Sequence, residues 1–214
     1  MGGVRSTSKP NVCTLPYSHA KFVQNPDSDR YFFTRKVGLS HKMAETTLPK
    51  EMKAQVLEAF NQPYALKTLP IPQLASNDDL LIKVDAASYC HTDAVLASGQ
   101  MRPNPPSFPH ISCHEFAGTI VSLSDSPSPA AKQYRVGQKV GAPGRAYHPC
   151  GTCFECLDTT RQDSDYVGYS VYCSNAGNNG ISRNGGFSEY AVVDARQVAL
   201  LPESITPVDA APLM

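Results

Sequence analysis

Four cysteines in the second half of the sequence have the spacing of a metal site. Cys150, Cys153 and Cys156 form a C-x2-C-x2-C run, and Cys173 follows after sixteen residues. Zinc in structural sites is held tetrahedrally by such thiolates, and a tight turn lets both thiolates of a C-x2-C pair reach one ion. The surrounding segment has little apolar periodicity, so burial alone cannot hold it together. We therefore predict a structural zinc lobe over residues 143–186; the alternative is a set of free or redox-active thiols.

A second group of metal-ligand side chains lies at the ends of two expected strands. Cys90 follows one strand, and His114 and Glu115 precede another. A thiolate and an imidazole at the ends of adjacent strands can meet at one metal ion, and both are good zinc ligands. Asp93 is placed to hold the second nitrogen of His114, and Thr92 to bring a hydroxyl beside the metal. These motifs are weak when taken alone, because a cysteine is often simply buried.

The elements that must position these residues are mainly β. Between them, residues 102–109 hold four prolines and are expected to be loop. Gly118 inside a strand indicates a bulge or a close backbone approach. A short helix is expected over 92–98, ending at Gly99. Strands are expected over 54–59, 80–86, 116–123, 134–142 (after a turn), 187–193 and 197–201.

Composition narrows the class of protein. The 214 residues are 41% hydrophobic and 18% charged, which is enough apolar material for a packed core. Lys plus Arg and Asp plus Glu both number 19, so net charge does not indicate a nucleic-acid or anionic-membrane partner. We expect neither a membrane span nor a secretory signal, because no long apolar run occurs. Seven cysteines without such a signal favour a reducing, cytoplasmic location, where clustered cysteines bind metals.

The first 42 residues differ from the rest. They carry seven basic residues and only two acidic ones, Asp27 and Asp29, and they show no helix or strand periodicity. We predict a disordered N-terminal extension. The alternative is a mitochondrial transit peptide, which would place the protein in mitochondria. The two aspartates and the prolines of this segment argue against the amphipathic helix that such a peptide forms.

Together and in this order, the motifs resemble the zinc-dependent medium-chain alcohol dehydrogenases, from about residue 53 to the last. The resemblance implies a mainly β fold with short helices, a GroES-like irregular β-barrel domain over residues 50–214. The matching segments are Cys90-His91-Thr92-Asp93, His114-Glu115, Gly118, Val136-Gly137-x-x-Val140, the four-cysteine lobe, Gly185-Gly186-Phe187-Ser188-Glu189-Tyr190 and Ala210-Ala211-Pro212-Leu213-Met214.

The resemblance also implies metal ligands. Cys90 and His114 correspond to two ligands of a catalytic zinc. Glu115 corresponds to an acidic residue beside that zinc, which ligates it when substrate is absent. The structural zinc ligands would be Cys150, Cys153, Cys156 and Cys173.

Three further residues receive catalytic or cofactor roles by the same resemblance. Thr92 corresponds to the hydroxyl that takes the proton from the alcohol, and Asp93 to the residue that orients the histidine ligand. His91, together with Thr92, corresponds to a contact with the NAD or NADP cofactor. The implied reaction is hydride transfer between this cofactor and a small alcohol or carbonyl substrate. A homo-oligomer is compatible with the resemblance; nucleic-acid and membrane partners are not expected.

The sequence also departs from the family pattern. The family's third catalytic cysteine should come directly after Met214, and no G-x-G-x-x-G motif of a Rossmann domain occurs. We therefore expect an incomplete domain without a Rossmann domain, and a chain that is inactive alone. The alternative is a non-catalytic zinc-binding remnant or interaction module. Cys113 replaces the usual glycine before His114, and the longer spacing to Cys173 costs only about 0.7 kcal/mol in loop closure.

Overall fold

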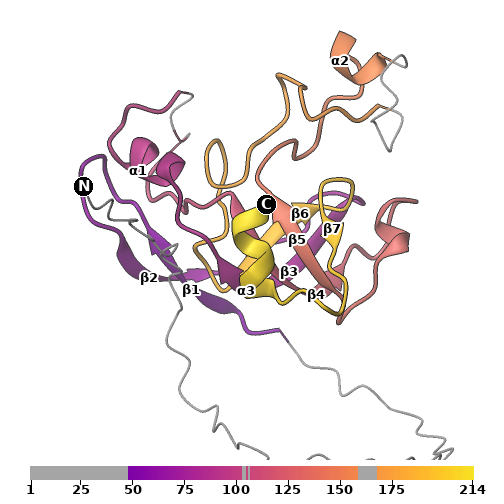
Figure 1. The fold of residues 1–214 in the computed structure, drawn as a ribbon, viewed down its shortest axis with the longest axis horizontal. Helices are drawn as coiled ribbons and strands as arrows, with labels where there is room; N and C mark the ends of the chain where they lie inside the picture. The colour runs from indigo at the N-terminus through magenta and orange to yellow at the C-terminus, as the bar shows by residue number, and fades with distance from the viewer. Residues whose placement is uncertain (1–47, 103–104, 106, 159–167) are drawn as a thin grey trace, which may run out of the picture. The chain divides into compact units, whose positions relative to one another are not determined.

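A computed structural model describes residues 48–102, 105, 107–158 and 168–214. The predicted disorder of residues 1–42 lies outside the described residues. From residue 50 onwards the chain is mainly β with short helices, as predicted (Figure 1). Within the described part, no helix is long and apolar enough to cross a membrane.

In the described part of the chain, seven antiparallel strands form two sheets. The larger sheet has the order β6-β3-β4-β5-β7, and the smaller one pairs β1 with β2. A bridge from Ala54 to Ser188, just before β6, joins the two sheets. The strands are β1 (Glu51–Val56), β2 (Ala65–Pro70), β3 (Asp79–Ala87), β4 (Glu115–Leu123), β5 (Lys139–Pro143), β6 (Tyr190–Asp194) and β7 (Ala199–Leu200). The helices are α1 (His91–Ala97), α2 (Phe154–Leu157) and α3 (Pro207–Ala210), with 3-10 turns η1 (Ala131–Gln133) and η2 (Ala211–Leu213).

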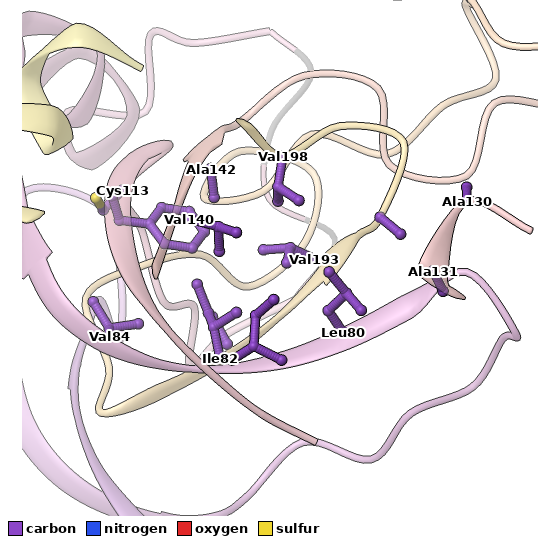
Figure 2. Packing of buried hydrophobic residues seen from close by; sticks show 14 residues of the cluster. Leu80, Ile82, Val84, Cys113, Ala130, Ala131, Val140, Ala142, Val193 and Val198 are labelled. Carbon is purple, nitrogen blue, oxygen red and sulfur yellow. The ribbon is translucent and has the colours of Figure 1, made fainter. Parts of the chain in front are cut away.

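The central strand β3 is buried on both faces over its first half, where its sequence is apolar, whereas Lys83 and Asp85 of its second half are exposed. Leu80 and Ile82 on one face pack in the cluster shown in Figure 2, with side chains of β4, β5 and β6. Leu81 on the other face packs with Met52 and Val56 of β1. The first half of β3 is therefore packed between two hydrophobic clusters.

The predicted strands are present, but their ends move and one strand was missed. β1 begins at Glu51, three residues earlier than expected, and β6 begins only at Tyr190. No strand was predicted over β2, since its residues are mostly exposed and show no alternation. Gly118 of β4 meets the prediction of a close approach: a Cβ there would overlap the carbonyl oxygen of Lys83 on β3. The β3–β4 register also shifts beside it.

Candidate metal centres

The loop after β3 and the loop before β4 bring Cys90 and His114 together. The Cys90 sulfur lies 3.5 Å from Nε2 of His114, and this nitrogen lies 3.8 Å from a carboxylate oxygen of Glu115. The three ligand atoms all lie within 4.8 Å of one another. β3 and β4 are neighbours in the sheet, so their adjacent ends place these side chains at the same edge. The structure thus assembles the three residues that the sequence suggested.

Asp93 does not hold His114, contrary to the sequence-based prediction. One carboxylate oxygen accepts a hydrogen bond from the backbone N–H of Cys90 at 3.0 Å. The other accepts from the backbone N–H of Cys113 at 2.9 Å. Both oxygens are therefore engaged by backbone donors, and Nδ1 of His114 is buried without a partner among the described residues. The buried carboxylate of Asp93 instead joins the two loops that carry the ligands.

Thr92 and His91 lie in the first turn of α1, directly after Cys90. The Thr92 side chain is half-buried and hydrogen-bonds the Cys90 sulfur, whereas His91 is exposed. Burial raises the pKa of the Cys90 thiol, and the hydrogen bonds from Thr92 and Asp93 only partly oppose this rise. The neutral thiol is thus favoured until a cation comes close.

Cys113, in place of the usual glycine, has a backbone conformation that glycine favours. Its φ is +79°, in the left-handed region, and its side chain is fully buried. A returning segment packs against it so closely that a Cβ on Gly180 or Gly185 would overlap the Cys113 carbonyl group. The N–H of Gly186 donates to the Cys113 carbonyl oxygen at 2.9 Å. The sulfur contacts two backbone carbonyls and belongs to the core, so it is not a fourth ligand of the set formed at Cys90.

The four predicted lobe cysteines converge on one point. Their sulfurs all lie within 4.8 Å of one another, with Cys173 at 3.7 Å from Cys150 and 3.9 Å from Cys153. A tetrahedral zinc with Zn–S bonds of ~2.3 Å requires sulfur separations of about 3.8 Å. α2 begins directly after Cys153 and places Cys156 on the inner side of the turn. The donor set therefore fits a closed structural zinc site.

The thiols of the lobe differ in their ease of ionisation. Hydrogen bonds from Thr152 and then Asn175 and Cys153 lower the pKa of Cys150 to about 5. Burial, followed by the neighbouring sulfurs, raises the pKa of Cys156 to about 12. Four sulfurs this close cannot all ionise unless a positive charge lies among them. A divalent metal would supply that charge.

One polar cluster at the base of the lobe was not predicted from the sequence. The side chains of Asp79 and Asp194 are fully buried, and both contact His148, two residues before Cys150. The sequence offered one signal for this cluster: a charged residue at the end of each of two apolar strands, Asp79 and Asp194. Their partners lie far away in the sequence, so no local pattern could have named them.

Comparison with known proteins places this geometry in a family. Residues 76–203, more than half of the chain, match the alcohol dehydrogenase GroES-like domain. An alcohol dehydrogenase of Geobacillus stearothermophilus is 33% identical over 163 residues, which are 76% of this chain and 43% of that protein.

Two solved structures are similar in fold as well as sequence. One is a thermostable alcohol dehydrogenase from Pyrobaculum aerophilum with bound cobalt and zinc (26% identity, TM-score 0.59, 76% of this chain and 44% of that one). The other is acetophenone reductase from Geotrichum candidum in complex with NAD (26% identity, TM-score 0.61, 77% and 44%). The chain thus spans less than half the length of these relatives. On the match to more than half of its residues, this chain belongs to the family of the alcohol dehydrogenase GroES-like domain.

Proposed function

We propose that residues 50–214 are the zinc-binding catalytic-domain portion of an NAD(P)-dependent alcohol dehydrogenase-like oxidoreductase. Its reaction interconverts a small alcohol and an aldehyde or ketone by hydride transfer. The observation that carries the proposal is the presence of two different donor sets in one domain. Four sulfurs form a closed set, while Cys90, His114 and Glu115 form a mixed set. Closed thiolate sets are typical of structural zinc, and three-ligand sets of catalytic zinc.

Each residue of the mixed set has a role in this proposal. Cys90, His114 and Glu115 would hold the catalytic ion, and Nε2 is the histidine atom that faces the other two ligands. When bound, zinc supplies Lewis acidity toward an alcohol or carbonyl oxygen. Thr92 lies against the Cys90 sulfur, where its hydroxyl can accept and pass on a proton of the substrate. Asp93 keeps the two ligand loops at a fixed separation through its backbone hydrogen bonds.

The cofactor and substrate classes rest on the relatives. The Geotrichum structure contains NAD, and both solved relatives act on alcohols or ketones by their names. His91 is exposed beside Thr92, which suits contact with a bound dinucleotide. We accordingly assign His91 and Thr92 to the cofactor side of the site.

Metal analysis tests the zinc part of the proposal. The purified chain should bind one tightly held zinc and a second, more weakly held one. Cys150→Ser should remove the first, whereas Cys90→Ser should remove only the second. Retention of both ions in either variant would contradict the assignment of the ligands.

A chimera tests the catalytic part. Residues 50–214 would replace the matched segment of the Geobacillus alcohol dehydrogenase, and NAD-dependent oxidation of primary and secondary alcohols would be followed. We expect the chimera to turn over alcohols. Turnover should be lost in Cys90→Ala and kept in the control variant Asp125→Asn, at an exposed residue. A zinc-loaded chimera without turnover would favour a non-catalytic zinc-binding module. The 214-residue chain alone should show no turnover, because no dinucleotide-binding motif occurs in it.

A further inference from the structure

The chain enters the four-cysteine lobe through a strained segment. Ala146 and His148, on either side of Tyr147, have φ values of +65° and +50° although neither is glycine. Non-glycine residues keep such conformations only where the surrounding contacts over-determine them. The contacts made by residues 146–148 therefore set the direction in which Cys150 leaves the domain.

Two buried carboxylates on neighbouring strands make these contacts. Asp79 begins β3 and Asp194 ends β6, and the two are directly paired across the ladder. Asp79 accepts a hydrogen bond from Nε2 of His148 at 2.8 Å and one from the Tyr147 hydroxyl at 2.9 Å. Asp194 accepts from the backbone N–H of His148 at 3.0 Å. His148 is thus held by both strands, through its ring and through its backbone.

Other groups keep both carboxylates in place. The second oxygen of Asp79 accepts from the N–H groups of Ala75 and Ser76 at 2.7 and 2.9 Å. Arg196 binds Asp194 with two side-chain nitrogens, at 2.9 and 2.7 Å. Two buried carboxylates side by side would repel each other without such partners. Contacts outside the lobe therefore fix the positions of Asp79 and Asp194. These two residues, called the anchor below, can in turn hold His148.

The same segment also fixes the chain that returns from the lobe. Tyr147 and Gly177 exchange two backbone hydrogen bonds of 2.8 Å. The guanidinium of Arg183 lies 3.2 Å from the centre of the Tyr147 ring, and it donates to Asn179 at 2.7 Å. The outgoing chain before Cys150 and the returning chain after residue 173 are consequently locked together at one point.

We propose that Asp79 and Asp194 are positioning residues for the four-cysteine metal site. By holding His148, they present the outgoing and returning chains at the separation that lets the sulfurs meet. The inference rests on the proposed zinc occupancy of the lobe. Residues that hydrogen-bond metal ligands commonly change metal affinity by about 10–100-fold when replaced. Because Asp79 and Asp194 act through His148, two residues before Cys150, we expect the lower end of this range, about 10-fold.

The test measures transfer of zinc from the purified chain to the chromogenic chelator 4-(2-pyridylazo)resorcinol. Asp79→Asn and Asp194→Asn should each weaken retention of the tightly held zinc by about 10-fold. Asp85→Asn is the matched control, since Asp85 is an exposed carboxylate of β3 that accepts a hydrogen bond from Thr119, away from the Asp79 and Asp194 cluster. Its zinc retention should equal that of the unchanged protein.

A second variant separates positioning from general loss of structure. The His148 side chain is 30% exposed, so His148→Ala should fold even if a buried aspartate variant does not. His148→Ala should reproduce the zinc loss of Asp79→Asn. The double variant, Asp79→Asn with His148→Ala, should lose no more zinc than either single variant. The thiolate-to-metal absorption of the cobalt-substituted lobe should weaken in the same variants.

The outcomes distinguish the inference from the function on which it rests. If the Cys150→Ser variant holds as much zinc as the unchanged protein, the zinc assignment fails. The positioning role of Asp79 and Asp194 then fails with it. If that zinc is present but His148→Ala and Asp79→Asn retain it as Asp85→Asn does, only the anchor role is overturned. Additive losses in the double variant would also overturn it, because they would show two unconnected effects.

Discussion

The strained residue Cys113 allows a direct test of the backbone next to His114. Its φ of +79° is a left-handed conformation that costs a residue with a Cβ roughly 1–2 kcal/mol, but costs glycine almost nothing. Replacing Cys113 by alanine removes the buried sulfur and keeps the strain. Replacing it by glycine removes the sulfur and the strain together. The difference between the two variants therefore combines the relief of strain with the loss of the Cβ and the greater freedom of glycine in the unfolded chain.

The expected magnitude follows from opposing terms. Glycine loses about 0.5–1 kcal/mol relative to alanine through the greater freedom of the unfolded chain. Relief of the left-handed strain returns roughly 1–2 kcal/mol. Cys113→Gly should therefore unfold with a free energy about 0–1.5 kcal/mol higher than Cys113→Ala, if the buried Cβ adds little. For a folded part of this size, each kcal/mol of added stability raises the melting temperature by about 2–4 °C.

Thermal melts of the two zinc-loaded variants provide the measurement. Ala117→Gly is the control, because Ala117 is also fully buried but is not among the residues with positive φ. There, glycine should lower the melting temperature. If Cys113→Gly melts below Cys113→Ala, as at the control position, the backbone at Cys113 is not strained and the reasoning is wrong.

Three other predictions follow from the structure. Zinc content should fall by one ion per chain in Cys150→Ser and equally in Cys173→Ser; unequal losses, read by atomic absorption, would show that the four sulfurs do not act as one site. Burial lowers the pKa of His110 below its usual 6.5 and keeps the ring neutral, so the unfolded chain takes up the proton first and stability should fall as pH drops below about 6.5. Melts at pH 7.5 and 5.5 should show a smaller decline in His110→Gln than in the unchanged protein, and an equal decline would contradict this assignment. Gly118→Ala should destabilise the sheet by about 1–3 kcal/mol, since its Cβ would overlap a neighbouring strand. Gly137→Ala, with open space around it, should show only the cost of its positive φ. Equal losses of stability for the two variants in denaturant melts would refute the overlap.

The sequence predicted those features that depend on local pattern. The strand at 80–86 was found because its residues partly alternate between apolar and polar, and in β3 the exposed Lys83 and Asp85 flank the buried Val84. The four-cysteine site was found because its first three ligands lie within seven residues of one another. β2 was missed because Leu66 and Lys67 are both exposed and the strand has no buried face of its own.

Interactions between distant segments could not be predicted in the same way. Asp93 was expected at the ring of His114, but a carboxylate in this loop has backbone donors within reach that a sequence does not reveal. The pairing of Asp79 with His148 joins positions 69 residues apart. Cys113 could be recognised as unusual, yet only the structure shows that its φ explains the preference for glycine.

The contrast between local and distant contacts has a consequence for the order of folding. The lobe cysteines pair over separations of 20 and 23 residues, whereas their anchor at Asp79 requires a closure of 69 and the contact from Ile111 to Asn184 one of 73. Short loops close first, because the entropy lost on closure grows with loop length. During synthesis the cysteines can therefore come together before Asp194 is paired with Asp79, and the site would reach its full affinity for metal only once both carboxylates hold His148. Because β6 pairs with β3 and β7 with β5, the last strands would close the sheet and complete the metal site in the same step.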